Sequence, residues 1–400
     1  MKTKNEISFF AKTNHRNSNQ PFGIKQTDRI SHTYIIGKTG TGKTTLLETK
    51  ITQDIQSGRG LALIDPHGDL VENIYQNIPE SRRNDVVYIN VPDSSNSWGY
   101  NPLKRVSIAK RPLVASGILE IFKKQFDSSS WGVRMEHILR NVLLTLLDQP
   151  RADFSCIPHI LNDKAYRKEA IQCVTNISVK EFWTDEYEKY PVYLRANAIA
   201  PIQNKIGAFL ANPTVKRILV QPKKEIHVRH IMDKKKILLL NLSKGIIGED
   251  AAHLLGGLLL TSAGLAAFSR ADTVEEDRIP FMMYVDEFQN FSTLSLINML
   301  SELRKYKVGL ILANQYLHQL EKDIREAVLG NVGTIISFRL GPHDARYMAQ
   351  EFYPTFNQED IVNLPNYMIY LKLMIDGMPS KPFSANSLRK EDLGTRANLF

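Results

Sequence analysis

Short apolar runs alternate with amphipathic segments at both ends of this 400-residue chain. Helical patterns follow the first two runs, one ending near residue 56 and one covering residues 69–77. The apolar runs, which we expect to form strands, are residues 33–37, 60–65, 85–90, 236–241, 281–286, 308–313, 334–338 and 367–375. Such alternation is typical of an α/β fold in which helices flank a mostly parallel sheet.

The middle of the chain has a different pattern. From residue 104 to residue 229 the periodicity is helical, with one apolar face formed by Met135, Ile138, Leu139, Val142, Leu143, Leu146 and Leu147. Prolines divide this region into short helices, at positions 150, 158, 191, 201 and 213. We therefore predict an all-α domain, 104–229, inserted into a discontinuous α/β core, 21–103 and 230–385. Residues 1–20 are expected to form a flexible segment and residues 386–400 a C-terminal tail.

A glycine-rich segment joins the first expected strand to the helix after it. Residues 35–44 read Ile-Ile-Gly-Lys-Thr-Gly-Thr-Gly-Lys-Thr, a complete phosphate-binding loop (P-loop) between strand and helix. Its glycines let backbone N–H groups turn toward phosphates, and the helix start adds a positive dipole end. The pattern predicts that Lys43 reaches the β- and γ-phosphates and that Thr44 ligates Mg²⁺. The residues expected to contact the nucleotide are Gly37, Lys38, Thr39, Gly40, Thr41, Gly42, Lys43, Thr44 and Thr45. An ordinary glycine-rich turn is the alternative interpretation.

A second run with functional character ends in two acidic residues. Residues 281–287 read Phe-Met-Met-Tyr-Val-Asp-Glu, as in a buried parallel strand with its polar tip at the ligand-binding edge of the sheet. This predicts that Asp286 holds Mg²⁺ and that Glu287 orients and polarises an attacking water. An acidic helix cap is the alternative. The sequence lacks a guanine-reading Asn-Lys-x-Asp motif, since Asn204-Lys205 is followed by Ile-Gly, and ATP is therefore the expected nucleotide.

Composition narrows the class of protein. With 43% hydrophobic and 23% charged residues, the chain has the composition of a globular protein that is soluble in water. Its net charge of +9 favours an anionic partner such as nucleic acid without requiring one. The two cysteines, Cys156 and Cys173, have no metal-ligand spacing and suit a reducing cytoplasm. The first thirty residues contain no signal-peptide pattern.

One stretch, residues 251–268, is apolar enough to resemble a membrane span. It lies between two expected strands, follows the acidic pair Glu249-Asp250 and contains polar residues. We therefore expect a helix buried against a sheet and no integral membrane segment, in a cytoplasmic protein that can still associate peripherally with a membrane.

A set of motifs along the chain identifies a family that it resembles. They are Gly37-Lys-Thr-Gly-Thr-Gly-Lys-Thr44, Asp65-Pro-His-Gly-Asp69, Asn101-Pro-Leu103, Val285-Asp-Glu-Phe-Gln289, Leu303-Arg-Lys-Tyr306, Ala313-Asn-Gln315 and Asn331-Val-Gly333. Together they resemble the ATPase domain of type IV secretion coupling proteins, the TraD/TraG group of the HerA/FtsK superfamily of DNA-pumping motors. The resemblance runs from about residue 21 to residue 383. It implies a RecA-like P-loop NTPase with a helical insertion.

The resemblance also implies partners and further catalytic residues. It implies a homo-oligomeric ring, usually a hexamer, with ATP between subunits and DNA in the central channel, and secretion-channel or relaxase proteins as partners. Gln315 corresponds to a sensor of the γ-phosphate. Arg304, eleven residues earlier, corresponds to an arginine finger supplied to the neighbouring subunit. Arg339 is the second choice for that finger.

Several interpretations stay open at this level. Asp65 could contact the Mg²⁺ shell through water, and Asp69 could cap the next helix. Basic residues also gather near the end of the helical region, and they either line a path for DNA or form a solvated charged face. They are Lys216, Arg217, Lys223, Lys224, Arg229, Lys234, Lys235 and Lys236. A HerA-like motor working with a nuclease and an ATP-dependent protein-remodelling factor are the alternative functions. The sequence leaves open subunit number, direction of movement and the strandedness of the DNA.

Overall fold

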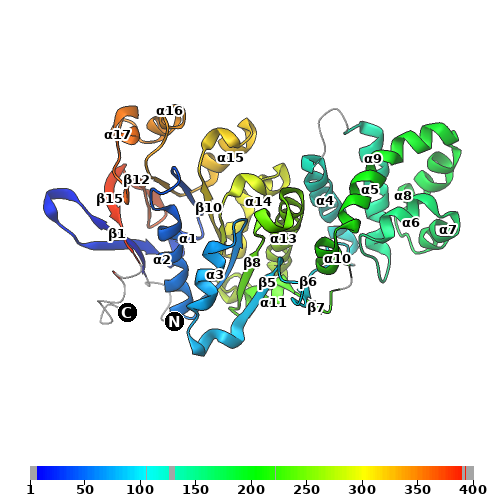
Figure 1. Cartoon of the computed structure of the whole chain (residues 1–400), viewed down its shortest axis with the longest axis horizontal. Helices are drawn as coiled ribbons and strands as arrows, with labels where there is room; N and C mark the ends of the chain where they lie inside the picture. Colours follow the sequence, from blue (N-terminus) through cyan, green and yellow to red (C-terminus); the bar gives the residue numbers. More distant parts are fainter. Residues whose placement is uncertain (1–6, 105, 126–130, 221, 390–391, 393–400) are drawn as a thin grey trace. The chain divides into compact units, whose positions relative to one another are not determined.

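The chain forms two compact units. The computed structural model describes residues 7–104, 106–125, 131–220, 222–389 and 392. Unit 1 comprises Met1–Tyr88, Val228–Ser243 and Ala266–Phe400, and unit 2 comprises Ile89–His227 and Lys244–Leu265 (Figure 1). The chain thus leaves unit 1 twice, whereas the sequence suggested one insertion at 104–229. The second segment outside unit 1 contains most of the apolar helix α13 (Glu249–Ser269). The apolar pattern of this helix does not reveal in which unit it packs.

Among the described residues, an eleven-stranded mixed sheet dominates unit 1. Six neighbouring strands, from β11 to β8, run parallel, as the sequence predicted. The order across the sheet is β2 (Pro21–Lys25), β1 (Ile7–Thr13), β15 (Phe383–Ser387), β12 (Met368–Lys372), β11 (Thr334–Ser337), β3 (Thr33–Ile36), β10 (Val308–Asn314), β9 (Phe281–Val285), β4 (Gly60–Asp65), β8 (Ile237–Asn241) and β5 (Val86–Asn90). Every residue of β3, β4, β8, β9 and β10 is buried, because both faces of the sheet are covered.

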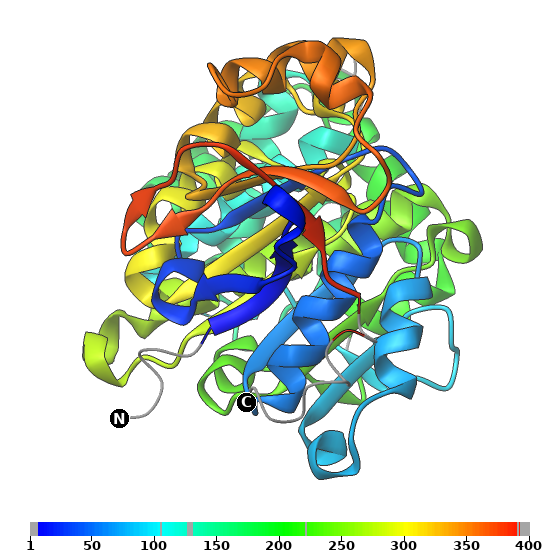
Figure 2. The same ribbon diagram turned by 90° about the vertical axis from the view of Figure 1, so that its left-hand side faces the viewer.

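Four antiparallel strands extend one side of this sheet. Figure 2 shows the blue strands β1 and β2 beside the red β15, and β15 pairs in turn with β12. The sequence prediction of a flexible segment at 1–20 is therefore wrong for residues 7–13, which alternate weakly and form a strand that pairs with the nearby β2 on one side and with the distant β15 on the other. The predicted tail, 386–400, likewise begins inside β15, and its residues 390–391 and 393–400 lie outside the described residues. A short hairpin, β13 (Met374–Ile375) with β14 (Met378–Pro379), ends the strand predicted at 367–375.

Two helices next to the P-loop cover one face of the parallel strands. They are α2 (Lys43–Gln56) and α3 (Asp69–Gln76). Leu47 and Ile51 of α2 are fully buried in the same apolar cluster as Leu63 and Ile311 of the sheet. Since burying each such side chain stabilises the fold by about 1.5–3 kcal/mol, α2 and the P-loop before it are firmly held. The remaining helices of unit 1 are α1 (Gln26–Arg29), α11 (Val228–Asp233), α14 (Leu294–Leu303), α15 (Lys322–Asn331), α16 (Pro342–Glu351) and α17 (Gln358–Val362).

A buried ion pair links α1, α2 and β9. The Arg29 guanidinium donates to both carboxylate oxygens of Asp54, at 2.6 and 2.7 Å, and the Tyr284 hydroxyl donates to the same carboxylate at 2.6 Å. Burial by itself would raise the pKa of Asp54, but the charge and hydrogen bonds of Arg29 outweigh burial and lower that pKa to about 2. The pair is therefore ionised at neutral pH.

Unit 2 is mainly helical. Its helices are α4 (Arg111–Gln125), α5 (Val133–Asp148), α6 (Cys156–Asn162), α7 (Lys164–Gln172), α8 (Ile177–Glu181), α9 (Val192–Ala211), α10 (Pro213–Leu219), α12 (Lys244–Ile247) and most of α13, with a two-residue strand pair, β6 (Trp98–Gly99) and β7 (Lys224–Glu225). The apolar face predicted for α5 is buried, from Met135 to Leu147. The predicted break at Pro201 does not occur. Helix α9 continues through this proline, which has no backbone N–H to donate to the helix.

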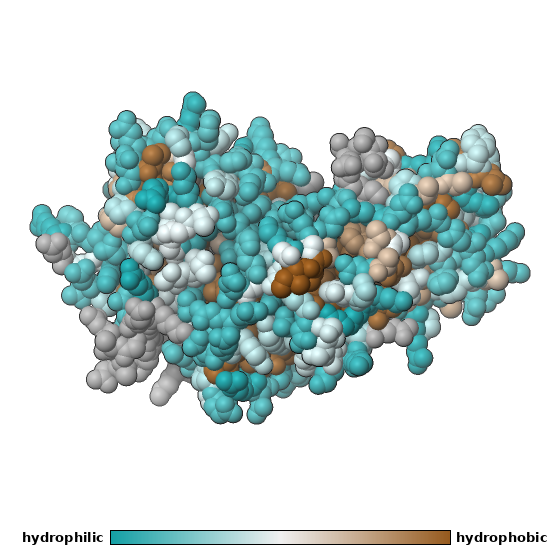
Figure 3. Space-filling model, in the orientation of Figure 1, coloured by the Kyte–Doolittle hydropathy of each residue, from teal (hydrophilic) through white to brown (hydrophobic). Residues whose placement is uncertain are grey.

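The apolar helix α13 and the turn after it, Glu249–Asp272, are long and apolar enough to cross a membrane. Within the described residues this is the one such helix, and 72% of its most apolar window is buried. That burial confirms the predicted burial of this helix. The molecular face drawn in Figure 3 is mostly hydrophilic, with small hydrophobic patches.

Candidate functional site

The P-loop follows β3 at the carboxyl edge of the parallel strands. Gly40 and Gly42 adopt φ angles of 76° and 121°, which side-chain-bearing residues rarely adopt. A Cβ atom on Gly42 would also lie 2.9 Å from Cδ1 of Tyr367. Backbone conformation and space therefore both require glycine at this position, and the loop wraps back toward the start of α2.

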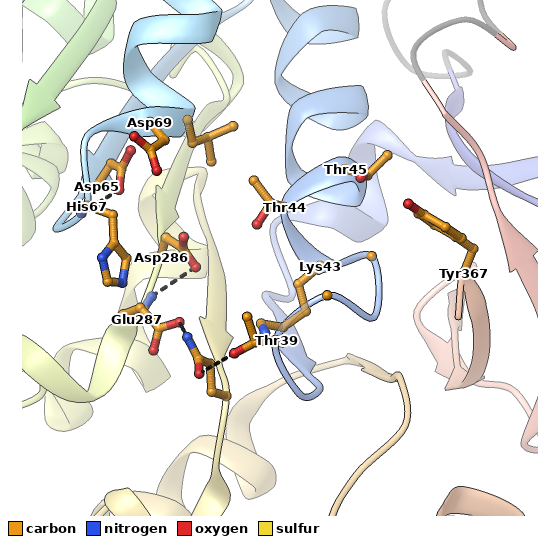
Figure 4. A pocket seen from close by; sticks show the side chains of 14 residues that line it. Thr39, Lys43, Thr44, Thr45, Asp65, His67, Asp69, Asp286, Glu287 and Tyr367 are labelled. Carbon is orange, nitrogen blue, oxygen red and sulfur yellow. Dashed lines mark hydrogen bonds between the residues drawn. The ribbon is translucent and has the colours of Figure 1, made fainter. Parts of the chain in front are cut away.

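A pocket of about 380 Å³ opens over this loop. Its lining comes from five places in the sequence (Figure 4) and consists of Thr39, Gly40, Gly42, Lys43, Thr44, Thr45, Asp65, His67, Asp69, Leu70, Asp286, Glu287, Gln315 and Tyr367. Its volume falls within the range of about 300–1,000 Å³ usual for small-molecule sites. The structure thus brings together the P-loop, the acidic pair and Gln315, although Thr39 of the loop and Gln315 are 276 residues apart in the sequence. Of the predicted loop contacts, Gly37, Lys38 and Thr41 do not line the pocket.

Lys43 is buried at the first position of α2. Its ammonium donates to the carbonyl oxygen of Gly37 and, at 3.4 Å, to that of Lys38. Burial lowers the pKa of Lys43, while the nearby charges of Glu287 and Asp286 oppose that shift. A cation held only by the loop's own carbonyl groups, and facing two carboxylates, is well placed to meet an anionic ligand.

Asp286 and Glu287 follow directly after β9. Both are buried, and the Glu287 N–H donates to Oδ1 of Asp286 at 3.0 Å. Burial, the neighbouring charge of Glu287 and that of Asp65 together raise the pKa of Asp286 to about 7. Glu287 has a φ of 45°, a left-handed conformation that costs a residue with a side chain roughly 1–3 kcal/mol. Such strain at the end of a strand is a common feature of functional sites.

A chain of hydrogen bonds connects the P-loop to Glu287. The Thr39 hydroxyl donates to Oε1 of Gln315 at 2.9 Å, and Nε2 of Gln315 donates to one oxygen of the Glu287 carboxylate at 2.6 Å. Nε2 of Gln289 donates to the other oxygen at 2.6 Å. The carboxylate is therefore held at both oxygens, and any ligand that moves Thr39 or Gln315 also affects Glu287.

Asp65 has a structural role of the kind that the sequence left open for Asp69. The Asp65 carboxylate accepts from the backbone N–H groups of His67, at 2.8 Å, and Val71, at 3.1 Å, and so fixes the turn into α3. Asp69 lies in the first turn of α3 but makes no capping hydrogen bond there. Asp69 therefore does not act as the cap that the sequence left open, because Asp65, four positions earlier, already binds the Val71 N–H in the first turn of α3.

All of the pocket residues except Tyr367 lie within one recognisable stretch of sequence. Residues 21–364 match the family model of the type IV secretion-system coupling protein DNA-binding domain. The chain belongs to this family. A search of curated proteins found no match by sequence.

Solved structures of coupling proteins share the fold. The chain is similar to the plasmid coupling protein TrwB in complex with a non-hydrolysable GTP analogue, with a TM-score of 0.69, 14% identity and coverage of 98% of this chain and 91% of that one. TrwB in complex with ADP and Mg²⁺ gives the same TM-score of 0.69, with 13% identity, covering 98% of this chain and 90% of that one. VirB4 of Thermoanaerobacter pseudethanolicus gives a TM-score of 0.61 at 14% identity, with 96% of each chain covered. At these identities the likeness concerns the fold.

The two arginines predicted for a coupling protein finger lie outside the pocket of their own chain. Arg304 is exposed in the turn before β10, whereas Gln315 follows the carboxyl end of that strand. Seven residues of strand separate the two ends by roughly 20 Å, more than a side chain spans. Arg339 follows β11, and its guanidinium donates to the carbonyl oxygen of Leu364 and, at 2.8 Å, to the Asn366 side chain.

The residues present suit Mg²⁺ bound together with a nucleotide. Thr44 and Asp286 line one pocket and offer oxygen ligands, which Mg²⁺ prefers. In the described part of the chain, no group of three or more His, Cys, Asp or Glu residues forms a metal cluster.

The sequence did not point to Tyr367 or His67 as pocket residues. Tyr367 lies more than 300 residues after the P-loop and has no motif around it, so only the folded chain places it there.

The predicted basic cluster is also partly structural. Arg217 donates to the carbonyl oxygens of Val91 and Asp93, and Arg229 pairs with Asp233 and Asp272.

Proposed function

We propose that this chain is an ATPase that couples hydrolysis to DNA translocation, as a ring-forming motor of type IV secretion or conjugation. The observation that carries this proposal is the hydrogen-bonded chain from Thr39 through Gln315 to Glu287, which joins the phosphate-binding loop to the expected catalytic carboxylate. A protein that only stored nucleotide would not need a buried glutamate held at both oxygens. The family match and the TrwB complexes with nucleotide analogues support the same ligand class.

Each pocket residue has a chemical task in this proposal. The loop N–H groups and Lys43 bind the triphosphate, and Thr44 and Asp286 hold Mg²⁺. When bound, Mg²⁺ neutralises charge on the β- and γ-phosphate oxygens. Glu287 orients the attacking water and accepts its proton, while Gln289 and Gln315 fix the carboxylate. Because Gln315 also contacts Thr39, it is suited to register the γ-phosphate.

A second subunit completes the site. Since Arg304 lies at the opposite edge of the sheet from its own pocket, it can stabilise a transferring phosphoryl group only in a neighbour's pocket. Arg339 is less suited, because its guanidinium already binds the loop at residues 364–366 of its own chain. A ring of subunits supplies every pocket with one finger, and the expected ring is a hexamer.

Mixing two inactive variants tests the shared site. Lys43→Ala subunits still offer Arg304, and Arg304→Ala subunits still offer an intact pocket, so a mixture should regain part of the ATPase rate in a concentration-dependent way. Lys305→Ala, a neighbouring exposed cation, is the matched control and should keep the normal rate. Co-assembled rings without recovery, together with a normal rate for Arg304→Ala alone, would exclude Arg304 as the finger.

The motor function itself is tested by the ATPase rate with and without DNA. We expect single- or double-stranded DNA to raise the rate, and DNA binding to weaken steeply with salt because lysines meet phosphates. A mass measurement on the same sample gives the number of 45.5 kDa subunits in the active species. ATPase activity that DNA does not change would favour a protein-remodelling factor, and a co-purifying nuclease would favour a HerA-like motor. Co-purification with secretion-channel or relaxase proteins would support a role in transfer.

A further inference from the structure

The pocket has two ends with different chemistry. Figure 4 shows Asp65, Asp286 and Glu287 on one side of the P-loop, and Thr45 and Tyr367 on the other. Because a P-loop binds the α- and β-phosphates with its backbone and the γ-phosphate near its lysine and acidic partners, the acidic end belongs to the γ-phosphate. The opposite end, near Thr45, then receives the α-phosphate and the nucleoside.

The backbone of Tyr367 is fixed at this nucleoside end. Its N–H donates to the carbonyl oxygen of Thr41 in the P-loop at 2.8 Å. Its carbonyl oxygen accepts from the backbone N–H and the hydroxyl of Ser387, at 2.8 and 3.0 Å. These bonds hold Tyr367 at a φ of 66°, an unfavourable conformation for a bulky residue. The surrounding structure thus fixes the position of the ring relative to the loop. Gly42, which has no side chain, leaves room for the ring to lie close to the loop.

One face of the ring carries a flat cation. The guanidinium of Arg389, an exposed residue, lies over the Tyr367 ring, 4.3 Å from its centroid. A planar group therefore fits on this face, and an exposed side chain is easily exchanged for a ligand. Stacking between an aromatic ring and a nucleobase needs the same flat contact.

We propose that Tyr367 is the stacking platform for the nucleobase of ATP, which takes the ring face now covered by Arg389. This inference rests on the proposed function, since it assigns the base end of the same nucleotide site. Stacking is a contact with the flat face of the base. Tyr367 should therefore increase the affinity for ligands that contain a base and not the affinity for the triphosphate alone.

Two ligands separate this role from a supporting role in the loop. Affinities for the β,γ-imido analogue of ATP and for inorganic tripolyphosphate, each with Mg²⁺, are measured by calorimetry on the whole chain. Tyr367→Ala should lower the affinity for the ATP analogue by about 5- to 150-fold, the range given by loss of one stacked base. The same substitution should leave the affinity for tripolyphosphate unchanged. Tyr367→Phe and Tyr367→Trp should keep the affinity of the parent chain, and Arg389→Ala should equal or exceed it.

A matched control exists elsewhere in unit 1. Tyr347 carries the Arg325 guanidinium 4.5 Å from its ring centroid but does not line the pocket, so Tyr347→Ala should change neither affinity. The proposal would be overturned if Tyr367→Ala lowered the affinities for both ligands equally, or lowered neither. It would also be overturned if Arg389→Ala lost as much affinity for the ATP analogue as Tyr367→Ala. Failure of the parent chain to bind either ligand would instead overturn the proposed function.

Discussion

Glu287→Gln is the substitution that most directly tests the catalytic assignment. In the structure the carboxylate accepts one hydrogen bond from Gln315 and one from Gln289, both at 2.6 Å and both from amide N–H groups. A glutamine side chain has one acceptor oxygen and one donor nitrogen. It therefore keeps one of these bonds and meets the other amide with a second donor. The lost charge-assisted hydrogen bond is worth about 1.5–3 kcal/mol.

The catalytic effect should exceed this structural cost. Loss of a positioned general base slows a reaction by about 10²- to 10⁴-fold, which corresponds to about 2.7–5.4 kcal/mol in the activation barrier. The hydrogen-bond cost applies equally to the ground state and the transition state, so it contributes little to kcat. Lys43, Thr44 and Asp286 are unchanged, and removal of the neighbouring negative charge lowers the pKa of Asp286, which favours Mg²⁺ binding. We therefore expect a large fall in kcat with nucleotide affinity retained.

The assay combines steady-state ATP hydrolysis with equilibrium binding of nucleotide to the same preparation. Glu326→Gln is the matched control, because Glu326 is an exposed residue on α15 outside the pocket, and it should leave both measurements unchanged. A normal kcat in Glu287→Gln would refute the assignment of the base. A loss of affinity as large as the loss of kcat would show that Glu287 is structural or a metal ligand.

Three further outcomes follow from named residues. Lys43→Ala should abolish nucleotide binding while the thermal unfolding midpoint stays near that of the parent, with the exposed Lys322→Ala as its control in both measurements. Because burial raises the pKa of Asp286 to about 7, Mg²⁺-dependent nucleotide affinity should fall as pH drops from 8 to 6, and titration of Asp286→Asn should not show this fall. Asp54→Asn should lower the free energy of unfolding at pH 7 by about 3–5 kcal/mol in a denaturant titration, since it leaves the buried Arg29 charge unpaired. The stability that Asp54 contributes is present above about pH 4 and lost as pH falls toward 2, so a mutant deficit that persists at pH 2 would contradict this reasoning.

The sequence alone determined the parts of this protein that depend on local order. A P-loop needs its glycines, lysine and threonine within one turn between a strand and a helix, so residues 37–44 and their neighbours were predictable as a unit. The strand ending at Asp286 was predictable for the same reason, since a fully buried strand is a continuous apolar run. These two segments, with the alternation of strands and helices, were enough to predict the parallel half of the sheet.

Tertiary structure decided everything that depends on distant partners. Residues 7–13 form strand β1 between the nearby β2 and the distant β15, and β15, more than 350 residues later, joins this hairpin to the sheet, which their own sequence does not reveal. Asp65 rather than Asp69 binds a free N–H group of α3, that of Val71, and this depends on the turn between Asp65 and the helix. Tyr367 is held at the pocket by backbone hydrogen bonds to Thr41 and Ser387, both distant from it in the sequence. Local sequence fixes φ, ψ preferences and burial over a few residues, whereas pocket geometry is set by long-range contacts whose partners one sequence does not reveal.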